Sequence, residues 1–124
     1  MAGAKLDGAG AAKMSTLENA RSTLQTIHGQ VERMAIDVKN NRGAGVTPGQ
    51  IKRTAGPMQG QLKGQFGVIA DQVTAMVLSM GRGGGDVAKV RVLREYVGQI
   101  RTALDMAATK VKEHHAVSIE ISPD

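Results

Sequence analysis

Apolar residues recur at alternating spacings of three and four positions along the first third of the chain. This is the a/d heptad pattern of helices that pack lengthwise against one another, and it continues for three repeats. Ser15 and Glu18 form a capping box, and the asparagine- and glycine-rich segment 40–45 favours a helix end. A first helix is therefore predicted over about residues 15–41. Its apolar positions are Leu17, Ala20, Leu24, Ile27, Val31, Met34 and Val38.

A second helix is predicted over about residues 48–81, with Thr47 as its cap and Pro48 at its first position. The heptad pattern continues except for one doubled spacing of four inside GPMQGQLKGQFG, residues 56–67. Glycine and proline disfavour helix interiors, so a break at Gly56–Pro57 is the alternative to one continuous helix. The apolar positions are Ile51, Ala55, Met58, Leu62, Phe66, Ile69, Val73, Met76 and Met80.

A third helix is predicted over about residues 86–115, after the glycine-rich turn at 81–85. Asp86 is its expected cap, and the alternating spacing resumes behind it. The apolar positions are Val90, Leu93, Val97, Ile100, Leu104, Ala107 and Val111.

Together these helices predict an all-α fold, an antiparallel up-down-up three-helix bundle with coiled-coil-like packing, because short turns force neighbouring helices to run antiparallel. The bundle is expected to occupy residues 14–115. A flexible N-terminal arm is expected at 1–13 and a short extended tail at 116–124. A dimer that exchanges helices between copies is the alternative arrangement.

The tail changes its period from helical to strand-like, because Val117, Ile119 and Ile121 alternate with polar residues. A lone strand is not stable in water, and an all-helical chain offers it no internal sheet. The tail is therefore expected to be disordered or to pair with a strand of another copy or another protein.

Composition narrows the classes of protein. The chain has no cysteine, which excludes disulfides and thiolate metal sites, and its aromatic fraction is 2%, so an aliphatic core is required. A net charge of +5 favours an acidic partner such as nucleic acid, an anionic membrane or an acidic protein. No apolar run is long enough to span a bilayer, and the first residues lack the pattern of a secretory leader. We therefore expect a cytoplasmic protein.

The glycines of the predicted second helix form a stripe. At 100° per residue, Gly56, Gly60, Gly64 and Gly67 fall within about 80° of one another, almost opposite the core. Lys52, Arg53 and Lys63 flank this stripe. Three interpretations remain open: the glycines are merely tolerated near a helix break, they allow another helix to pack closely, or they allow a phosphate backbone to approach.

A basic pole is also predicted. In an up-down-up bundle, the end of the first helix, the start of the second and the end of the third lie together. This places two acidic residues, Asp37 and Glu113, among six basic ones, with His114 and His115 nearby. The basic residues are Lys39, Arg42, Lys52, Arg53, Lys110 and Lys112.

Catalytic patterns are absent from the sequence. Adjacent His114 and His115 would diverge by about 100° on a helix and have no further ligands at useful spacing. No catalytic, metal or cofactor site and no small-molecule substrate is predicted. The favoured interpretation is a non-enzymatic helical bundle that self-associates as a homo-oligomer or docks onto a protein partner in a larger assembly. The alternative is a sequence-independent nucleic-acid-binding module that contacts the phosphate backbone, as a small subunit of a ribonucleoprotein complex would.

Overall fold

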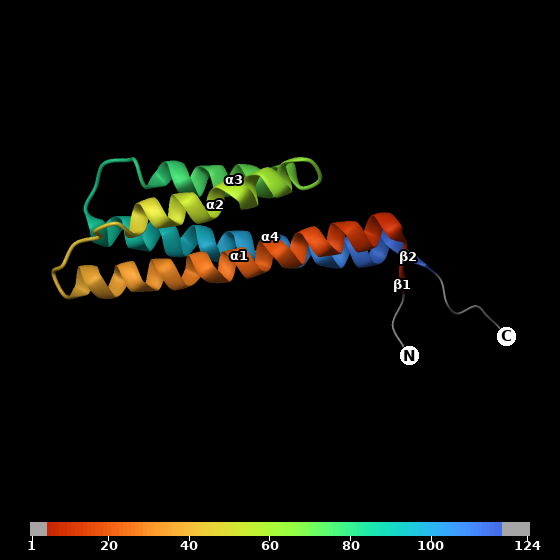
Figure 1. Cartoon of the computed structure of the whole chain (residues 1–124), viewed down its shortest axis with the longest axis horizontal. Coiled ribbons are helices and arrows are strands. Elements are labelled where there is room, and N and C mark those ends of the chain that lie inside the picture. The colour runs from red at the N-terminus through yellow and green to blue at the C-terminus, as the bar shows by residue number, and fades with distance from the viewer. Residues whose placement is uncertain (1–4, 118–124) are drawn as a thin grey trace.

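Four helices, joined in sequence by short connections, run alternately in opposite directions (Figure 1). The structure is a computed structural model that describes residues 5–117. The elements are β1 (Lys5–Leu6), α1 (Gly8–Lys39), α2 (Thr47–Lys63), α3 (Gly67–Ser79), α4 (Asp86–His115) and β2 (Ala116–Val117). The predicted all-α class is confirmed. The predicted three-helix bundle is wrong, because the segment expected to form one second helix folds into two.

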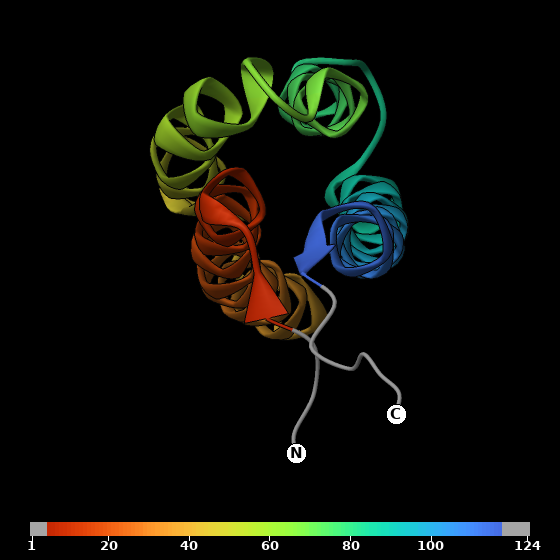
Figure 2. The same cartoon turned by 90° about the vertical axis from the view of Figure 1, so that its right-hand side faces the viewer.

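The two long helices α1 and α4 lie side by side, and the hairpin of α2 and α3 covers one half of their length (Figure 1). Viewed end-on, the helices form a ring in which each packs against its neighbours in the chain and α4 returns to α1 (Figure 2). One half of the bundle therefore has four helices across its section, and the other half has two.

The break between α2 and α3 falls at Gly64–Phe66, and α2 continues through Pro57. The expected continuous helix over 48–81 and its alternative break at Gly56–Pro57 are therefore both wrong. Pro57 lies on the exposed side of α2, where water can satisfy the carbonyl that loses its partner. Gly64 and Gly67 weaken the helix on either side of Phe66, whose non-helical backbone (φ −133°, ψ 58°) lies at the reversal of the chain.

The first helix begins at Gly8, so the expected helix start at Ser15 and the arm over residues 1–13 are wrong for residues 8–13. Asp7 is the N-cap, and its carboxylate accepts a hydrogen bond of 2.6 Å from the Gly10 amide. The end of α1 agrees with the prediction, because Asn41 and Gly43 have positive φ in the segment that follows this helix. The fourth helix has the bounds predicted for residues 86–115.

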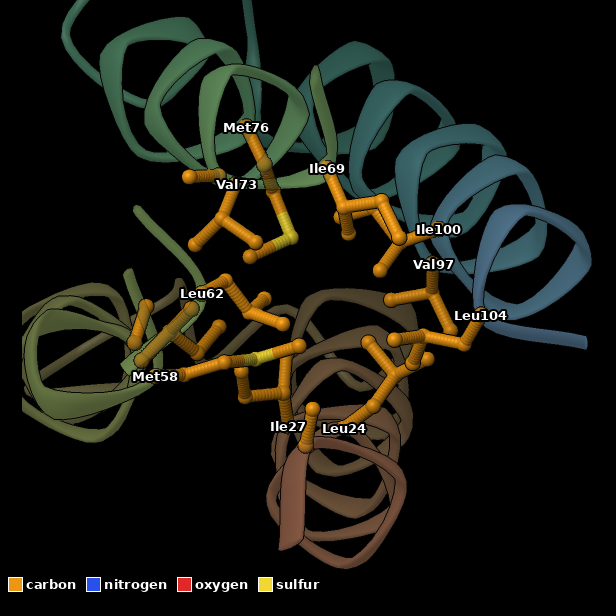
Figure 3. Packing of buried hydrophobic residues seen from close by; sticks show 14 of the residues in the cluster. Leu24, Ile27, Met58, Leu62, Ile69, Val73, Met76, Val97, Ile100 and Leu104 are labelled. Carbon is orange, nitrogen blue, oxygen red and sulfur yellow. The ribbon is translucent and has the colours of Figure 1, made fainter. Parts of the chain in front are cut away.

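The heptad positions form the core. Side chains from all four helices point into one centre, where Leu24 and Ile27 of α1 meet α2, α3 and α4 (Figure 3). Met58 and Leu62 enter this centre from α2, and Met76 enters it from α3. Folding back at Gly64–Phe66 is what brings the apolar face of α3 against α4, and this burial compensates for the broken helix.

The chain ends meet at the two-helix end. β1 pairs antiparallel with β2, with Lys5 opposite Val117 and Leu6 opposite Ala116. The expectation that the chain has no internal partner for its tail is therefore wrong for Val117, because α1 begins where α4 ends. Ile119 and Ile121, which were also predicted to pair, lie outside the described residues.

Candidate functional site

The connection between α1 and α2 and the connection between α3 and α4 lie at the same end of the bundle (Figure 1). We call this the loop end and define it as residues 33–53 and 73–92, which are the two connections plus the adjoining two turns of each helix. The opposite end, where α1 begins and α4 ends, is the chain end. This arrangement follows directly from the break in the middle of the chain, which returns α3 to the end from which α2 started.

The loop end contains the excess positive charge of the molecule. It has eight of the 16 basic residues and only two of the 11 acidic ones, Asp37 and Asp86. Its net charge of +6 exceeds the +5 of the whole chain, so the remainder is slightly negative. The basic residues are Arg33, Lys39, Arg42, Lys52, Arg53, Arg82, Lys89 and Arg91.

Most of these cations have no acidic partner. Arg42 forms an ion pair of 3.1 Å with Asp37, and within residues 5–117 none of the other seven makes one. Both connections place an exposed arginine beside glycine, as Arg42–Gly43 and Arg82–Gly83. Gly43 and Gly84 have positive φ, so the tight turns that present these arginines depend on glycine.

The outer face of α2 extends this basic surface. The helix has three cations, Lys52, Arg53 and Lys63, and no acidic residue. Gly56 and Gly60 are exposed, and a Cβ added at either would have no neighbour within 4 Å. Gly64 lies in the turn and Gly67 opens α3, with equally open surroundings, so the predicted single stripe of four glycines is divided between two helices.

The predicted basic pole is also divided. Lys39, Arg42, Lys52 and Arg53 do lie together at the loop end. Lys110 and Lys112 lie on the last turns of α4 at the chain end, and the two following histidines lie there too. The break at Gly64–Phe66 adds one reversal of direction, and this moves the end of α4 to the opposite end of the bundle.

A local cluster of charged and polar side chains joins α1 and α4 at the chain end. The imidazole of His115 lies 3.3 Å from the Asp7 carboxylate, and its other nitrogen is 3.1 Å from the Lys13 ammonium. The Gly10 amide lowers the pKa of the Asp7 carboxyl most, and the hydrogen bond to His115 lowers it further. A Cβ at Gly10 would clash with the His115 Cβ, so these two helices approach too closely there for a side chain. We call Asp7, Lys13 and His115 the terminal clasp.

Ion pairs also join the outer seam between α1 and α4. Arg94 donates two hydrogen bonds, of 2.8 and 2.7 Å, to the two oxygens of Glu32, and this pairing lowers the pKa of Glu32. Toward the loop end, the same seam opens into an apolar groove of about 810 Å³. Ile36 and Val87 are 56% and 65% exposed at this groove, which also includes Val90.

No group of three or more metal-ligating side chains gathers anywhere in residues 5–117. None of the helices described combines the length and apolarity needed to cross a membrane. Compared with known proteins, the chain matches no family model, and no curated protein or solved structure is significantly similar to it.

Four of the basic residues at the loop end were not part of the basic pole predicted from the sequence, namely Arg33, Arg82, Lys89 and Arg91. The signal that would have found them is topological. If the helix break is placed at Gly64–Phe66, the segments 40–46 and 80–85 must share an end, and every cation near either connection belongs to one surface.

Proposed function

We propose that this chain is a non-enzymatic binding module whose loop end contacts the phosphate backbone of duplex nucleic acid. The observation that supports the proposal is the concentration of eight cations, seven of them without ion pairs, against two carboxylates at one end of a rigid bundle. Duplex DNA has about one negative charge per 1.7 Å of its axis, so such a surface gains from releasing condensed counterions.

The absence of aromatic side chains at the loop end favours backbone contacts over base contacts. The chain has one phenylalanine and one tyrosine. Phe66 lies at the α2–α3 turn, away from the loop end, and Tyr96 is half-buried against the core. Single-strand binders stack bases on exposed aromatic rings, and this surface has none. Binding is therefore expected to be independent of sequence and to favour duplexes.

The test compares two variants that lose the same charge at opposite ends. The loop-end variant replaces Lys39, Lys52 and Arg82 with alanine. The chain-end variant replaces Lys110 and Lys112 near the end of α4, together with Arg101 at its middle. All six side chains are exposed and lack ion pairs in the described structure. Affinity for a labelled duplex is measured by fluorescence anisotropy across a range of salt concentrations.

Removing three phosphate contacts should reduce the slope of log K against log salt by about 3 for the loop-end variant. The chain-end variant should keep a slope close to that of the wild-type protein. Equal losses in both variants would show that only net charge matters, and binding that is insensitive to salt would contradict the proposal. An anionic vesicle, tested at the same charge concentration, should bind more weakly than the duplex.

A second candidate function, self-association, is supported by the apolar groove between α1 and α4. The occupant we propose is the same groove of a second copy, related by a twofold axis. Lys39 and Arg91 line the groove toward the loop end, and Glu95 lines it toward the middle of the bundle. An antiparallel pairing would bring the basic part of each groove against the acidic part of the other.

Light scattering tests this candidate directly. A dimer should have about twice the 13.0 kDa of the chain at high concentration, and Ile36→Arg should shift it toward monomer by burying a charge in the apolar interface. Val68→Arg is the matched control, because Val68 is 75% exposed on α3 and does not line this groove. A monomer at all accessible concentrations would refute the pairing.

A further inference from the structure

A polar groove of about 520 Å³ lies between α1 and α2, on the four-helix half of the bundle. It differs from the α1–α4 groove in its chemistry, because six of its seven lining residues have polar or charged side chains. The residues that matter here are Gly29, Gln30 and Arg33 from α1 and Gln50, Arg53 and Thr54 from α2. No carboxylate lines it, in a chain that has 11 acidic residues.

Two arginines approach the groove from opposite helices. Arg33 and Arg53 are both exposed, and neither forms an ion pair in the described part of the chain. The Arg53 side chain folds back along α2, and its Nη1 would lie 3.8 Å from a Cβ placed on Gly49. The wall remains low at Gly29, which has no side chain, so a ligand can enter from solvent.

Hydrogen bonds hold the polar wall between the arginines. Gln30 Nε2 donates to Thr54 Oγ1 at 3.0 Å, and Thr54 Oγ1 donates to the Gln50 carbonyl at 2.9 Å. This chain of bonds fixes the spacing of α1 and α2 at the groove. The Gln30 oxygen Oε1 is buried and has no hydrogen-bond partner. Buried polar atoms are rarely left unpaired, and because this oxygen only accepts hydrogen bonds, a buried water rather than an anion is expected beside it.

We propose that this groove is a phosphate-binding site in which Arg33 and Arg53 hold one phosphate group between α1 and α2. Guanidinium groups present paired N–H donors that match phosphate oxygens, and two of them without a competing carboxylate form a strong anion site. The Gln50 amide supplies a further polar group at the rim. The site deepens the proposed function, on which it rests for its natural ligand, because a backbone phosphate and a free phosphate present the same oxygens.

The test uses inorganic phosphate as the probe and the full chain as the protein. Phosphate is titrated at constant ionic strength, with chloride as the balancing anion, and NMR follows the Nε–Hε signals of the arginines and the amides of Gly29 and Gly49. Saturable shifts at these groups are expected. Arg33→Gln and Arg53→Gln should each weaken phosphate binding about tenfold or more, since each loses charge-assisted hydrogen bonds.

Arg101→Gln on α4 is the matched control, because Arg101 is exposed, unpaired in the described structure and does not line the groove. It should bind phosphate as the wild-type protein does. All three positions are exposed, so unchanged thermal melting should confirm that each variant folds. Shifts that do not saturate, or an equal weakening in all three variants, would overturn the groove as a site.

A parallel titration with duplex separates this site from the function proposed above. If phosphate saturates the groove and the duplex does not bind, the site stands and the nucleic-acid function falls. If the duplex binds through the loop end and phosphate does not saturate, the function stands and the groove proposal falls. Loss of duplex affinity in Arg33→Gln beyond that in Arg101→Gln would support both.

Discussion

The two halves of this bundle are stabilised differently. The loop half has four helices around an aliphatic core, together with an excess of unpaired positive charge. The chain-end half has only α1 and α4 in cross-section, and there the ion pair of Arg21 with Asp105, at 2.7 Å, and the terminal clasp join the two helices. The largest excess of like charge therefore lies over the half that buries the most apolar surface.

Burial of apolar surface beneath the loop end offsets the cost of its unpaired positive charge. A surface that binds anions must leave its cations unpaired, which costs stability through self-repulsion. The α2–α3 hairpin adds two apolar faces beneath that surface and compensates for this cost. The chain end has no such core to add, and there the chain uses the Asp7 cap and short-range ion pairs.

The largest expected effect comes from opening cavities in the two halves. Leu93 of α4 and Leu17 of α1 are both 0% exposed, and they lie in the loop half and the chain-end half. Leu93→Ala should cost about 4–5 kcal/mol, and Leu17→Ala about 2–3 kcal/mol, because two helices can close on a void more easily than four. Urea denaturation measures both values. Equal costs, or the reverse order, would show that the two halves pack alike.

A smaller effect separates the two kinds of glycine in the loop half. Gly60 lies on the exposed face of a regular helix, so Gly60→Ala should stabilise the protein by about 0.5–1 kcal/mol. Gly43 has φ +72°, so Gly43→Ala should destabilise it by about 1–2 kcal/mol. Thermal denaturation gives the two signs. A destabilising Gly60→Ala would mean that the α2 glycines are in close contact with another surface.

The smallest effect is a pH dependence that belongs to the chain end. The folded-state pKa of Asp7 is lowered, so its contribution to stability is present above the ordinary value of about 3.8 and is lost as pH falls through the lowered pKa. Asp7→Asn keeps a capping oxygen but cannot titrate, so its stability should fall less steeply in acid. Glu18→Gln, an exposed and unpaired carboxylate on α1, is the control.

The acid dependence is measured as the midpoint of urea denaturation from about pH 6 to about pH 2. If Asp7→Asn and the wild-type protein lose stability in parallel, the terminal clasp does not respond to pH as described. If Glu18→Gln flattens the curve as strongly as Asp7→Asn, the effect is one of general charge.

The long helices were predictable from sequence because their signal is local and repeated. Leu24 and Ile27 of α1, and Leu104 of α4, are buried as the alternating spacing predicts. Near the C-terminal end of α4 the buried alanine is Ala108, and the predicted Ala107 is only half-buried, a shift of one position that the heptad pattern cannot resolve. Helix ends also depend on single residues. Asp7 caps α1, although Ser15 has an equally suitable capping side chain.

The α2–α3 break was not predictable in the same way. A doubled spacing of four at Leu62–Phe66 fits a stutter in one long helix as well as a reversal of direction. Only the contacts that Val73 and Met76 make across the bundle decide between them, and those contacts are distant in sequence. The predicted basic pole was wrong for the same reason. One additional reversal of the chain moves Lys110 and Lys112 to the other end and brings Arg82 to the loop end.

The most direct test of the account is an NMR footprint of the loop end on the wild-type protein. Addition of a short duplex at low salt should shift the amide signals of residues 40–46 and 80–85 together, and leave those of residues 8–17 and 105–115 in place. Joint shifts in two segments about 40 residues apart would establish both the four-helix topology and the basic surface. Shifts confined to the chain end, or spread evenly along α1 and α4, would contradict the account.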